Sequence, residues 1–200
     1  PFNDPLVRKA FLYAIDKNKI TEEILQGEGI AANYGFIPEM IDFKQDTNFT
    51  ITQNIDKARS FLSSAGYPGG KDFPETILWV NTVEGTSISK WTVEVAEQIE
   101  QNLGINIRLK YCTFEERQAA IRSGNALFWR SGWIPDYPDP ESFVSIFYKK
   151  YSELNPFWGN VSCSNAAFDQ FYEQSLLEKN AANRNELLNS CNRLLMEEAI

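Results

Sequence analysis

The chain has 200 residues, of which 43% are hydrophobic and 14% aromatic, and its formal net charge at pH 7 is −8. This length and apolar content suit one soluble domain with a sizeable core, and the acidic balance argues against nucleic-acid binding, which requires a basic face. The absence of histidine excludes Ser-His-Asp and Cys-His catalysis, and most zinc sites, from these residues.

Two further features limit the kind of protein. No run of 18 or more apolar residues occurs, so the sequence predicts no membrane-spanning helix. Because no C-x-x-C motif occurs, we interpret Cys112, Cys163 and Cys191 as small buried side chains and expect neither a metal site nor a cofactor. The chain starts at Pro1 without Met or a signal segment, which is typical of a piece of a longer protein whose targeting signals lie elsewhere.

Helix signals dominate the first third of the chain. Asp4 and Asp16 are predicted N-caps of two helices, because an aspartate side chain can accept hydrogen bonds from free amides of the first turn. Residues 27–53 read as an irregular connection. Asn54 begins another helix, which Gly66 closes before a turn rich in proline and glycine.

The middle of the chain predicts a sheet. A short apolar strand at 76–80 is followed by a helix from Thr86 or Ser87 through Leu103, and then by an alternating strand at 105–111. This order is a βαβ unit, so the two strands should be parallel neighbours joined by a right-handed crossover, with the helix covering one face.

A third strand and a helical ending complete the prediction. Thr113 caps a helix whose apolar residues are Phe114, Ala119 and Ile121, and a strand at 126–130 follows. The remainder is predicted to contain a helix with Phe143, Ile146 and Phe147, an irregular stretch at 149–164, and helices at about 165–178 and 181–199. Together these elements predict an α/β fold with a mixed central sheet flanked by helices, in a single domain over residues 1–200.

The segment from Phe128 to Pro140 is the candidate functional site, because open α/β sheets bind ligands at the carboxyl ends of their strands. Prolines stiffen this loop, and aromatic walls with a few charges suit a small-molecule cleft. The candidate ligand-binding residues are Arg130, Trp133, Asp136 and Tyr137.

Structural roles remain open for some residues of the loop. Asp139, followed by Pro140, is predicted to cap the next helix, and Trp129 is predicted to lie in the core. Asp136 could serve a ligand or form a local turn with the backbone.

Three stretches resemble one known family. Residues 1–16 resemble the motif PFNDxxVRxAxxYAID, residues 56–68 resemble DxxKAxxLLxxAGYP, and residues 132–140 resemble GWxxDYPDP. All three are motifs of the bacterial family 5 extracellular solute-binding proteins, which include oligopeptide-, dipeptide- and nickel-binding proteins. Their order in the chain is that of the family's C-terminal lobe, without the N-terminal lobe or the final strand that returns to the hinge.

The resemblance implies a type II periplasmic-binding-protein-like lobe, one half of a clamp that closes over its ligand. It implies that Asp136 accepts a peptide's α-ammonium group, that Trp133 lines the adjoining pocket and that Arg130 receives a short peptide's carboxylate. It also implies an exported, monomeric binding protein, in the periplasm or at the outer face of the cytoplasmic membrane, that delivers its ligand to ABC permease subunits.

Alternative functions stay open beside this one. Within the family, a nickel complex, a sugar or another solute could replace the peptide. A carboxylate-dependent hydrolase could use Asp136 as the acid and Glu141 as the base. A metal-binding module could use Asp136, Asp139 and Glu141, although their spacing is not that of an EF-hand loop.

Overall fold

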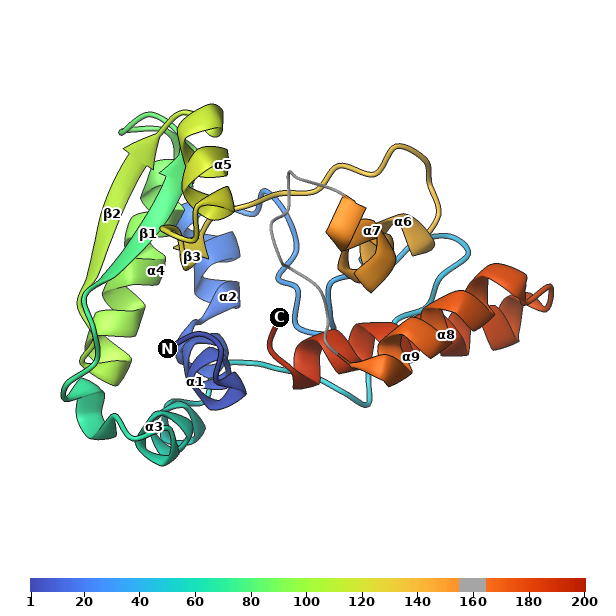
Figure 1. Cartoon of the computed structure of the whole chain (residues 1–200), viewed down its shortest axis with the longest axis horizontal. Helices are drawn as coiled ribbons and strands as arrows, with labels where there is room; N and C mark the ends of the chain where they lie inside the picture. The colour runs from blue at the N-terminus through green and yellow to red at the C-terminus, as the bar shows by residue number, and fades with distance from the viewer. Residues whose placement is uncertain (155–164) are drawn as a thin grey trace. The chain divides into compact units, whose positions relative to one another are not determined.

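The computed structural model describes residues 1–154 and 165–200 of the chain, which form two compact units. Unit 1 comprises Pro1–Ala31 and Thr52–Ser131, and unit 2 comprises Ala32–Ile51 and Gly132–Ile200. Unit 1 contains the sheet, whereas unit 2 is built from helices and irregular segments (Figure 1). The sequence predicts a single lobe over the whole chain, and the pairing of the two units in one lobe stays a prediction.

The elements of unit 1 follow the predicted order. They are α1 (Pro5–Ala14), α2 (Lys17–Lys19) with a π-helical turn (Ile20–Ile24), α3 (Ile55–Ser64), a 3-10 turn (Pro68–Gly70), β1 (Thr76–Asn81), α4 (Ser87–Leu103), β2 (Ile107–Cys112), α5 (Phe114–Arg122) and β3 (Phe128–Trp129). The helix starts are confirmed, because each predicted cap accepts a backbone hydrogen bond of 2.8 to 3.2 Å through its side chain: Asp4, Asp16, Asn54, Thr86 and Thr113.

The three strands form one sheet in the order β2-β1-β3. β1 runs parallel to β2 with Thr76 opposite Ile107, and parallel to β3 with Leu78 opposite Phe128. The predicted βαβ unit is therefore confirmed. Within the described residues every strand pair of this sheet is parallel, which differs from the predicted mixed sheet and follows from the helical crossovers that join the strands.

Side chains of β1 alternate between two hydrophobic layers, as the twofold period of a strand requires. Leu78 and Val80 pack in a cluster with Val95 and Ile99 of α4. Trp79 packs on the other face, with Ala120 of α5. Helices thus cover both faces of the sheet (Figure 1).

The face of α5 differs from the prediction. Phe114 and Ala119 are exposed, whereas Arg117 and Gln118 are buried. The reason is a set of tertiary contacts. Arg117 donates hydrogen bonds to the Asn81 side chain and to the Arg130 carbonyl, and the apolar pattern of α5 does not predict these contacts.

Unit 2 contains α6 (Glu141–Val144), a 3-10 turn (Ser145–Phe147), α7 (Lys149–Leu154), α8 (Ala166–Leu177) and α9 (Ala181–Glu197). Part of the stretch predicted as irregular is therefore helical, since Lys, Glu and Leu in Lys149–Leu154 are good helix formers that extend the preceding turn. The rest of that stretch, 155–164, lies outside the described residues.

The irregular segment 32–51 supplies two side chains to the core of unit 2. Ile37 and Phe43 have no exposed surface and pack with Phe168, Tyr172 and Leu188. Although this segment has no helix, it is therefore an integral part of the helical unit.

Asn192 of α9 fixes the segment 32–51 by hydrogen bonds to its backbone. The side chain is 2% exposed, and its Oδ1 accepts hydrogen bonds from the backbone of Phe36 at 2.7 Å and of Ile37 at 3.2 Å. Its Nδ2 donates to the Tyr34 carbonyl at 2.9 Å. The contact requires glycine at Gly35, where φ is +132° and a Cβ would lie 2.0 Å from Nδ2 of Asn192.

The predicted burial of the cysteines holds in full for one of them. Cys191 is buried in the core of unit 2, and Cys112 is half-buried at the end of β2. Cys163 lies outside the described residues. Among the helices that the structure describes, none has the length and apolar character needed to cross a membrane.

Candidate ligand-binding loop

The predicted site residues are divided between the two units, because the chain passes from unit 1 to unit 2 after Ser131. Arg130 continues β3 in unit 1, where its backbone N–H donates to the Trp79 carbonyl at 2.8 Å. Trp133, Asp136 and Tyr137 lie in one short loop of unit 2. The structure thus brings the last three together in unit 2, whereas Arg130 directly follows β3 in unit 1.

Asp136 is an exposed residue with no helix or strand around it. Within the described residues, its carboxylate has no hydrogen bond, ion pair or turn contact, so the alternative of a local side-chain turn is not seen. An exposed carboxylate without a protein partner can accept a cationic group of a ligand.

Tyr137 connects the loop to α6. Its hydroxyl donates to Oε2 of Glu141 at 2.5 Å, and this hydrogen bond, with burial, raises the pKa of Tyr137 to about 12. The Glu141 side chain, in a residue only 8% exposed, also accepts from the Tyr172 hydroxyl. The Tyr137 hydroxyl is therefore a structural anchor, while half of its surface remains accessible to a ligand.

Asp139 caps the helical segment that follows the loop, as predicted. Its Oδ1 accepts from the backbone N–H of Glu141 at 2.8 Å. The same oxygen accepts from Nη2 of Arg184 in α9 at 2.8 Å, an ion pair that the sequence did not predict. Asp139 is thus fully engaged in structure, in contrast with Asp136 three positions earlier.

The ion pair makes part of the stability depend on pH. Burial alone would raise the pKa of Asp139, but hydrogen bonds from Arg184 and from the Glu141 backbone lower it below its usual value. A carboxyl with a lowered folded-state pKa stabilises the fold above its unfolded pKa of about 3.9, and this contribution is lost as the pH falls through the folded-state value.

We expect Asp139→Asn to lower the free energy of unfolding by about 1 kcal/mol at pH 7, since the pair is partly exposed. Urea unfolding at several pH values should show this difference shrinking as the pH falls from about 5 to about 2. Asp136→Asn, which removes an exposed carboxylate without a partner, is the matched control and should change little at any pH. A difference that stayed constant across this range would contradict the role of the charge.

Trp133 and Arg130 are less exposed than the other two candidates. Trp133 is partly buried and packs against the core of unit 2. Arg130 is half-buried, and burial lowers the pKa of its guanidinium. Its backbone carbonyl accepts from Nη1 of Arg117 at 2.6 Å, so a second arginine, which the sequence did not indicate as a site residue, lies beside it.

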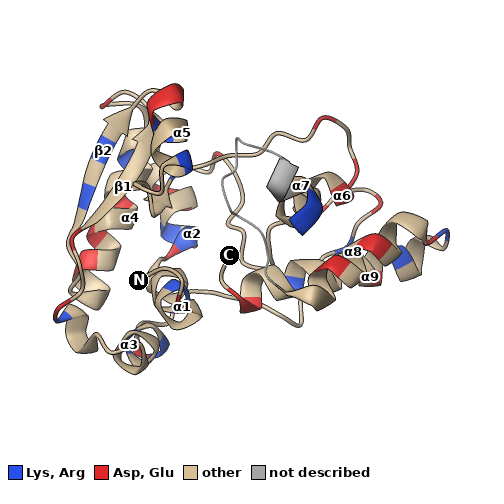
Figure 2. Ribbon diagram, viewed as in Figure 1, with Lys and Arg blue, Asp and Glu red and all other residues tan. Residues whose placement is uncertain are grey.

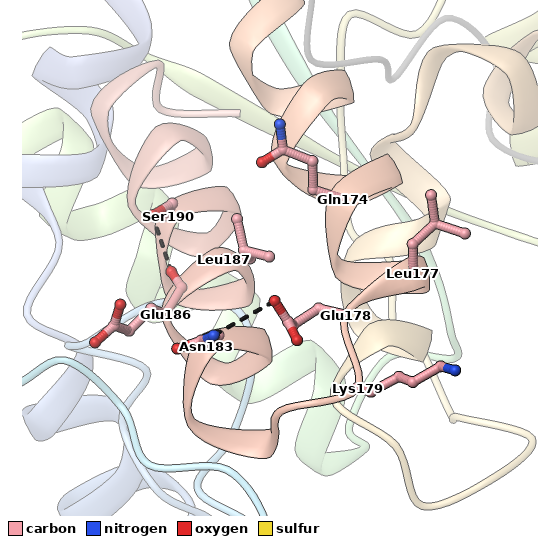
Figure 3. A pocket seen from close by; sticks show the side chains of 8 residues that line it. All are labelled: Gln174, Leu177, Glu178, Lys179, Asn183, Glu186, Leu187 and Ser190. Carbon is pink, nitrogen blue, oxygen red and sulfur yellow. Dashed lines mark hydrogen bonds between the residues drawn. The ribbon is translucent and has the colours of Figure 1, made fainter.

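Two hollows in the described surface contain none of the four predicted residues. One, of about 710 Å³, lies between α8 and α9 (Figure 3), where Asn183 donates to Glu178 and Leu177 and Leu187 add apolar surface. The other, of about 580 Å³, lies at the carboxyl ends of β1 and β2 and includes Asn81 and Phe114. The second hollow is at the edge of the sheet where α/β proteins place their ligands.

Charged and metal-ligating side chains do not gather at one place in the described residues. Lys and Arg are scattered over several elements of both units (Figure 2). Within residues 1–154 and 165–200, no group of three or more metal-ligating side chains is found. Of the three carboxylates considered for a metal, Asp139 pairs with Arg184, and Glu141 accepts from two tyrosines.

A parallel α/β sheet with an aromatic, charged loop after its third strand is characteristic of a lobe that binds small solutes. The chain belongs to the bacterial extracellular solute-binding proteins of family 5, because the family model described as "Bacterial extracellular solute-binding proteins, family 5 Middle" matches residues 1–155. This confirms the resemblance inferred from the three motifs. Members of this family are binding proteins rather than enzymes.

Individual relatives agree with the family. Over its whole length the chain is 30% identical to the periplasmic murein peptide-binding protein MppA of Escherichia coli K12, and over 99% of its length 25% identical to the oligopeptide-binding protein OppA of Bacillus subtilis 168. It spans 36% of each of these proteins.

A solved structure confirms the fold. The crystal structure of the periplasmic oligopeptide-binding protein OppAIV from Borrelia burgdorferi matches 99% of this chain with a TM-score of 0.86 and 29% sequence identity. The chain covers 38% of that structure. The predicted type II periplasmic-binding-protein fold is thereby confirmed.

Proposed function

We propose that this chain forms part of the substrate-binding component of an ABC importer that captures oligopeptides or dipeptides. In this proposal Asp136 accepts the α-ammonium group of the peptide, Trp133 and the ring of Tyr137 line its pocket, and Arg130 receives a carboxylate. The named relatives, which are described as peptide-binding proteins, support the peptide as ligand class.

The observation that carries the proposal is the contrast among the acidic residues of one loop. Asp139 and Glu141 are held by protein donors, whereas Asp136 is exposed and has no partner among the described residues. A carboxylate that stabilises no part of the fold, placed beside aromatic side chains, is suited to bind a cationic ligand group.

The proposal includes the setting in which the protein works. We propose that it is exported to the periplasm or the outer face of the cytoplasmic membrane, acts as a monomer, and delivers its ligand to permease subunits. Catalysis, a cofactor and nucleic acid have no part in this role. Within the family, a nickel complex, a sugar or another solute is the alternative ligand, and the absence of histidine disfavours direct nickel ligation by this chain.

Ligand release from the natural protein tests the proposal. The protein is purified at its full natural length and denatured, and the released compounds are identified by mass spectrometry. Calorimetry with the tripeptide Ala-Ala-Ala then measures affinity directly. Release of peptides and a dissociation constant below about 100 μM, near −5.5 kcal/mol, would support the proposal. Release of a sugar or a metal complex alone, with no binding of Ala-Ala-Ala, would show that it is wrong.

A further inference from the structure

Glu141, the first residue of α6, has a buried carboxylate directly after the candidate ligand-binding loop. The residue is 8% exposed. Its Oε2 accepts from the hydroxyl of Tyr137 in the loop at 2.5 Å, and its Oε1 accepts from the hydroxyl of Tyr172 in α8. One carboxylate therefore links the loop, α6 and α8 within unit 2.

The charge of Glu141 is buried without a cation. Within residues 1–154 and 165–200 it has no ion pair, and the Arg184 guanidinium pairs with Asp139 instead. The hydrogen bond to Glu141, with burial, raises the pKa of Tyr137, and burial, with the hydrogen bond to Glu141, raises the pKa of Tyr172. Both phenols are therefore protonated donors at neutral pH, and hydrogen bonds to an ionised acceptor are stronger than those between neutral groups.

The stability of unit 2 alone does not call for a carboxylate at this position. A buried charge loses its hydration, and apolar side chains of similar volume often stabilise a fold equally well. Tyr172 already packs in the apolar core, with its ring centroid 4.7 Å from that of Tyr148. Two directed hydrogen bonds fix geometry instead, because each requires its hydroxyl at a defined distance and angle. Glu141 thus determines where the Tyr137 hydroxyl lies.

The position of Tyr137 affects the loop because Tyr137 directly follows Asp136. The Tyr137 carbonyl accepts from the backbone N–H of Asp139 at 2.9 Å, and Oδ1 of Asp139 accepts from the backbone N–H of Glu141 at 2.8 Å. Residues 137–141 are thus closed into one hydrogen-bonded turn, and the side-chain bond between Tyr137 and Glu141 spans it. Asp136 is exposed and has no partner of its own among the described residues, so this turn limits where its carboxylate can lie.

We propose that Glu141 is a positioning residue for ligand binding: held by Tyr172 on one oxygen, it fixes the Tyr137 hydroxyl with the other and so keeps the loop in its binding conformation. This role takes the place of the general base and of the metal ligand considered for Glu141 from the sequence. The effect on ligand affinity rests on the proposed function, whereas the fixing of the loop by Glu141 does not.

The first test follows amide hydrogen exchange of the natural full-length protein, without ligand, by mass spectrometry. Tyr137→Phe removes the donor hydroxyl and keeps the ring. We expect the amides of residues 139–143 to exchange about tenfold faster in this variant, because the turn opens locally, while α8 and α9 keep their protection. Glu141→Gln should act in the same way, since an amide side chain offers one acceptor oxygen to two hydroxyls.

Tyr148→Phe is the matched control for the exchange experiment. The Tyr148 hydroxyl also donates to a glutamate of unit 2, Glu173, but it lies outside the loop, so exchange in 139–143 should not change. Tyr137→Phe covers the case in which Glu141→Gln fails to fold, since Tyr137 is half-exposed. If Tyr137→Phe left exchange in 139–143 unchanged, or accelerated α8 and α9 as much as the turn, the side-chain bond would be merely structural and the proposal would be wrong.

The second test measures the affinity of the same proteins for Ala-Ala-Ala by calorimetry. A loop that adopts its binding conformation for only about a tenth of the time binds about tenfold more weakly. We therefore expect Tyr137→Phe and Glu141→Gln each to raise the dissociation constant about tenfold, and Tyr148→Phe to leave it within about twofold. The double variant should bind about as weakly as either single variant, because both substitutions remove the same hydrogen bond.

The two tests separate this proposal from the proposed function. Unchanged affinity in both single variants, in a protein that binds Ala-Ala-Ala, would overturn the positioning role of Glu141 while leaving peptide binding intact. If the unsubstituted protein did not bind Ala-Ala-Ala, the peptide assignment would be wrong, and the exchange rates of 139–143 would still decide whether Glu141 holds the loop.

Discussion

Replacing Asp136 by Ala in the natural full-length protein is expected to weaken peptide binding by about 2–5 kcal/mol, or about 30-fold to several thousand-fold. The loss arises because the ligand's ammonium group would be desolvated without a compensating charge. Since Asp136 is exposed and has no partner in the described structure, its removal should change the free energy of unfolding by less than about 0.5 kcal/mol.

Calorimetry with Ala-Ala-Ala and with its N-acetylated form checks this expectation. The acetylated peptide lacks the positive charge, so the unsubstituted protein should bind it as weakly as Asp136→Ala binds the free peptide. Asp139→Asn is the matched control, because Asp139 lies in the same loop but is held by Arg184. Equal binding of the free and the acetylated peptide would show that Asp136 does not receive the ammonium group.

Replacing Phe43 by Ala is expected to lower the free energy of unfolding by about 3–5 kcal/mol, because the ring is completely buried in the core of unit 2 and its removal leaves a cavity. Ile41→Ala is a matched control two positions away, since Ile41 is 97% exposed and should contribute less than about 0.5 kcal/mol. Urea unfolding followed by circular dichroism measures both changes.

Amide hydrogen exchange can locate the effect within the chain. The amides of α8 and α9 should lose protection in Phe43→Ala before those of α4, because Phe43 packs in unit 2 and α4 belongs to unit 1. Equal destabilisation by Phe43→Ala and Ile41→Ala would show that the segment 32–51 is not part of the core.

The parts of the fold that the sequence predicts are those determined by near neighbours. Thr113 and Glu116 form a reciprocal capping box within four residues, and Gly104 ends α4 with φ at +71°, so both helix boundaries can be inferred from local patterns. The parallel pairing of β1 and β2 also follows from a short βαβ unit. Local rules were sufficient for most of unit 1.

Unit 2 was less predictable because its contacts join distant residues. Ile37 and Phe43 stand in a stretch without periodicity, so nothing in the sequence around them distinguishes buried from exposed apolar side chains. Asn192 accepts a hydrogen bond from the backbone of Phe36, which is 156 positions away. In the sequence, a buried asparagine of a helix cannot be distinguished from a polar residue on the surface.

In the candidate site, too, local contacts could be predicted from the sequence and contacts between distant residues could not. The capping role of Asp139 was predictable because its partner, the Glu141 amide, is two positions away, whereas the ion pair with Arg184 spans 45 positions. The burial of Arg117 was not predicted, because the apolar residues of α5 suggested a different buried face. The only sequence signal available was its helical spacing from Ile121, which packs against the core.

The discontinuous composition of unit 2 has a consequence during protein synthesis. Unit 1 is complete once Ser131 has left the ribosome, but Ile37 and Phe43 must wait for Leu188 and Leu195 of α9 before they can be buried. At about 5–20 residues per second, this interval lasts several seconds, during which a loop between two segments of unit 1 presents apolar side chains to the cytosol. A translational pause between Ser131 and Leu195 would prolong that exposure and favour chaperone capture or aggregation, whereas the same pause after α9 would not.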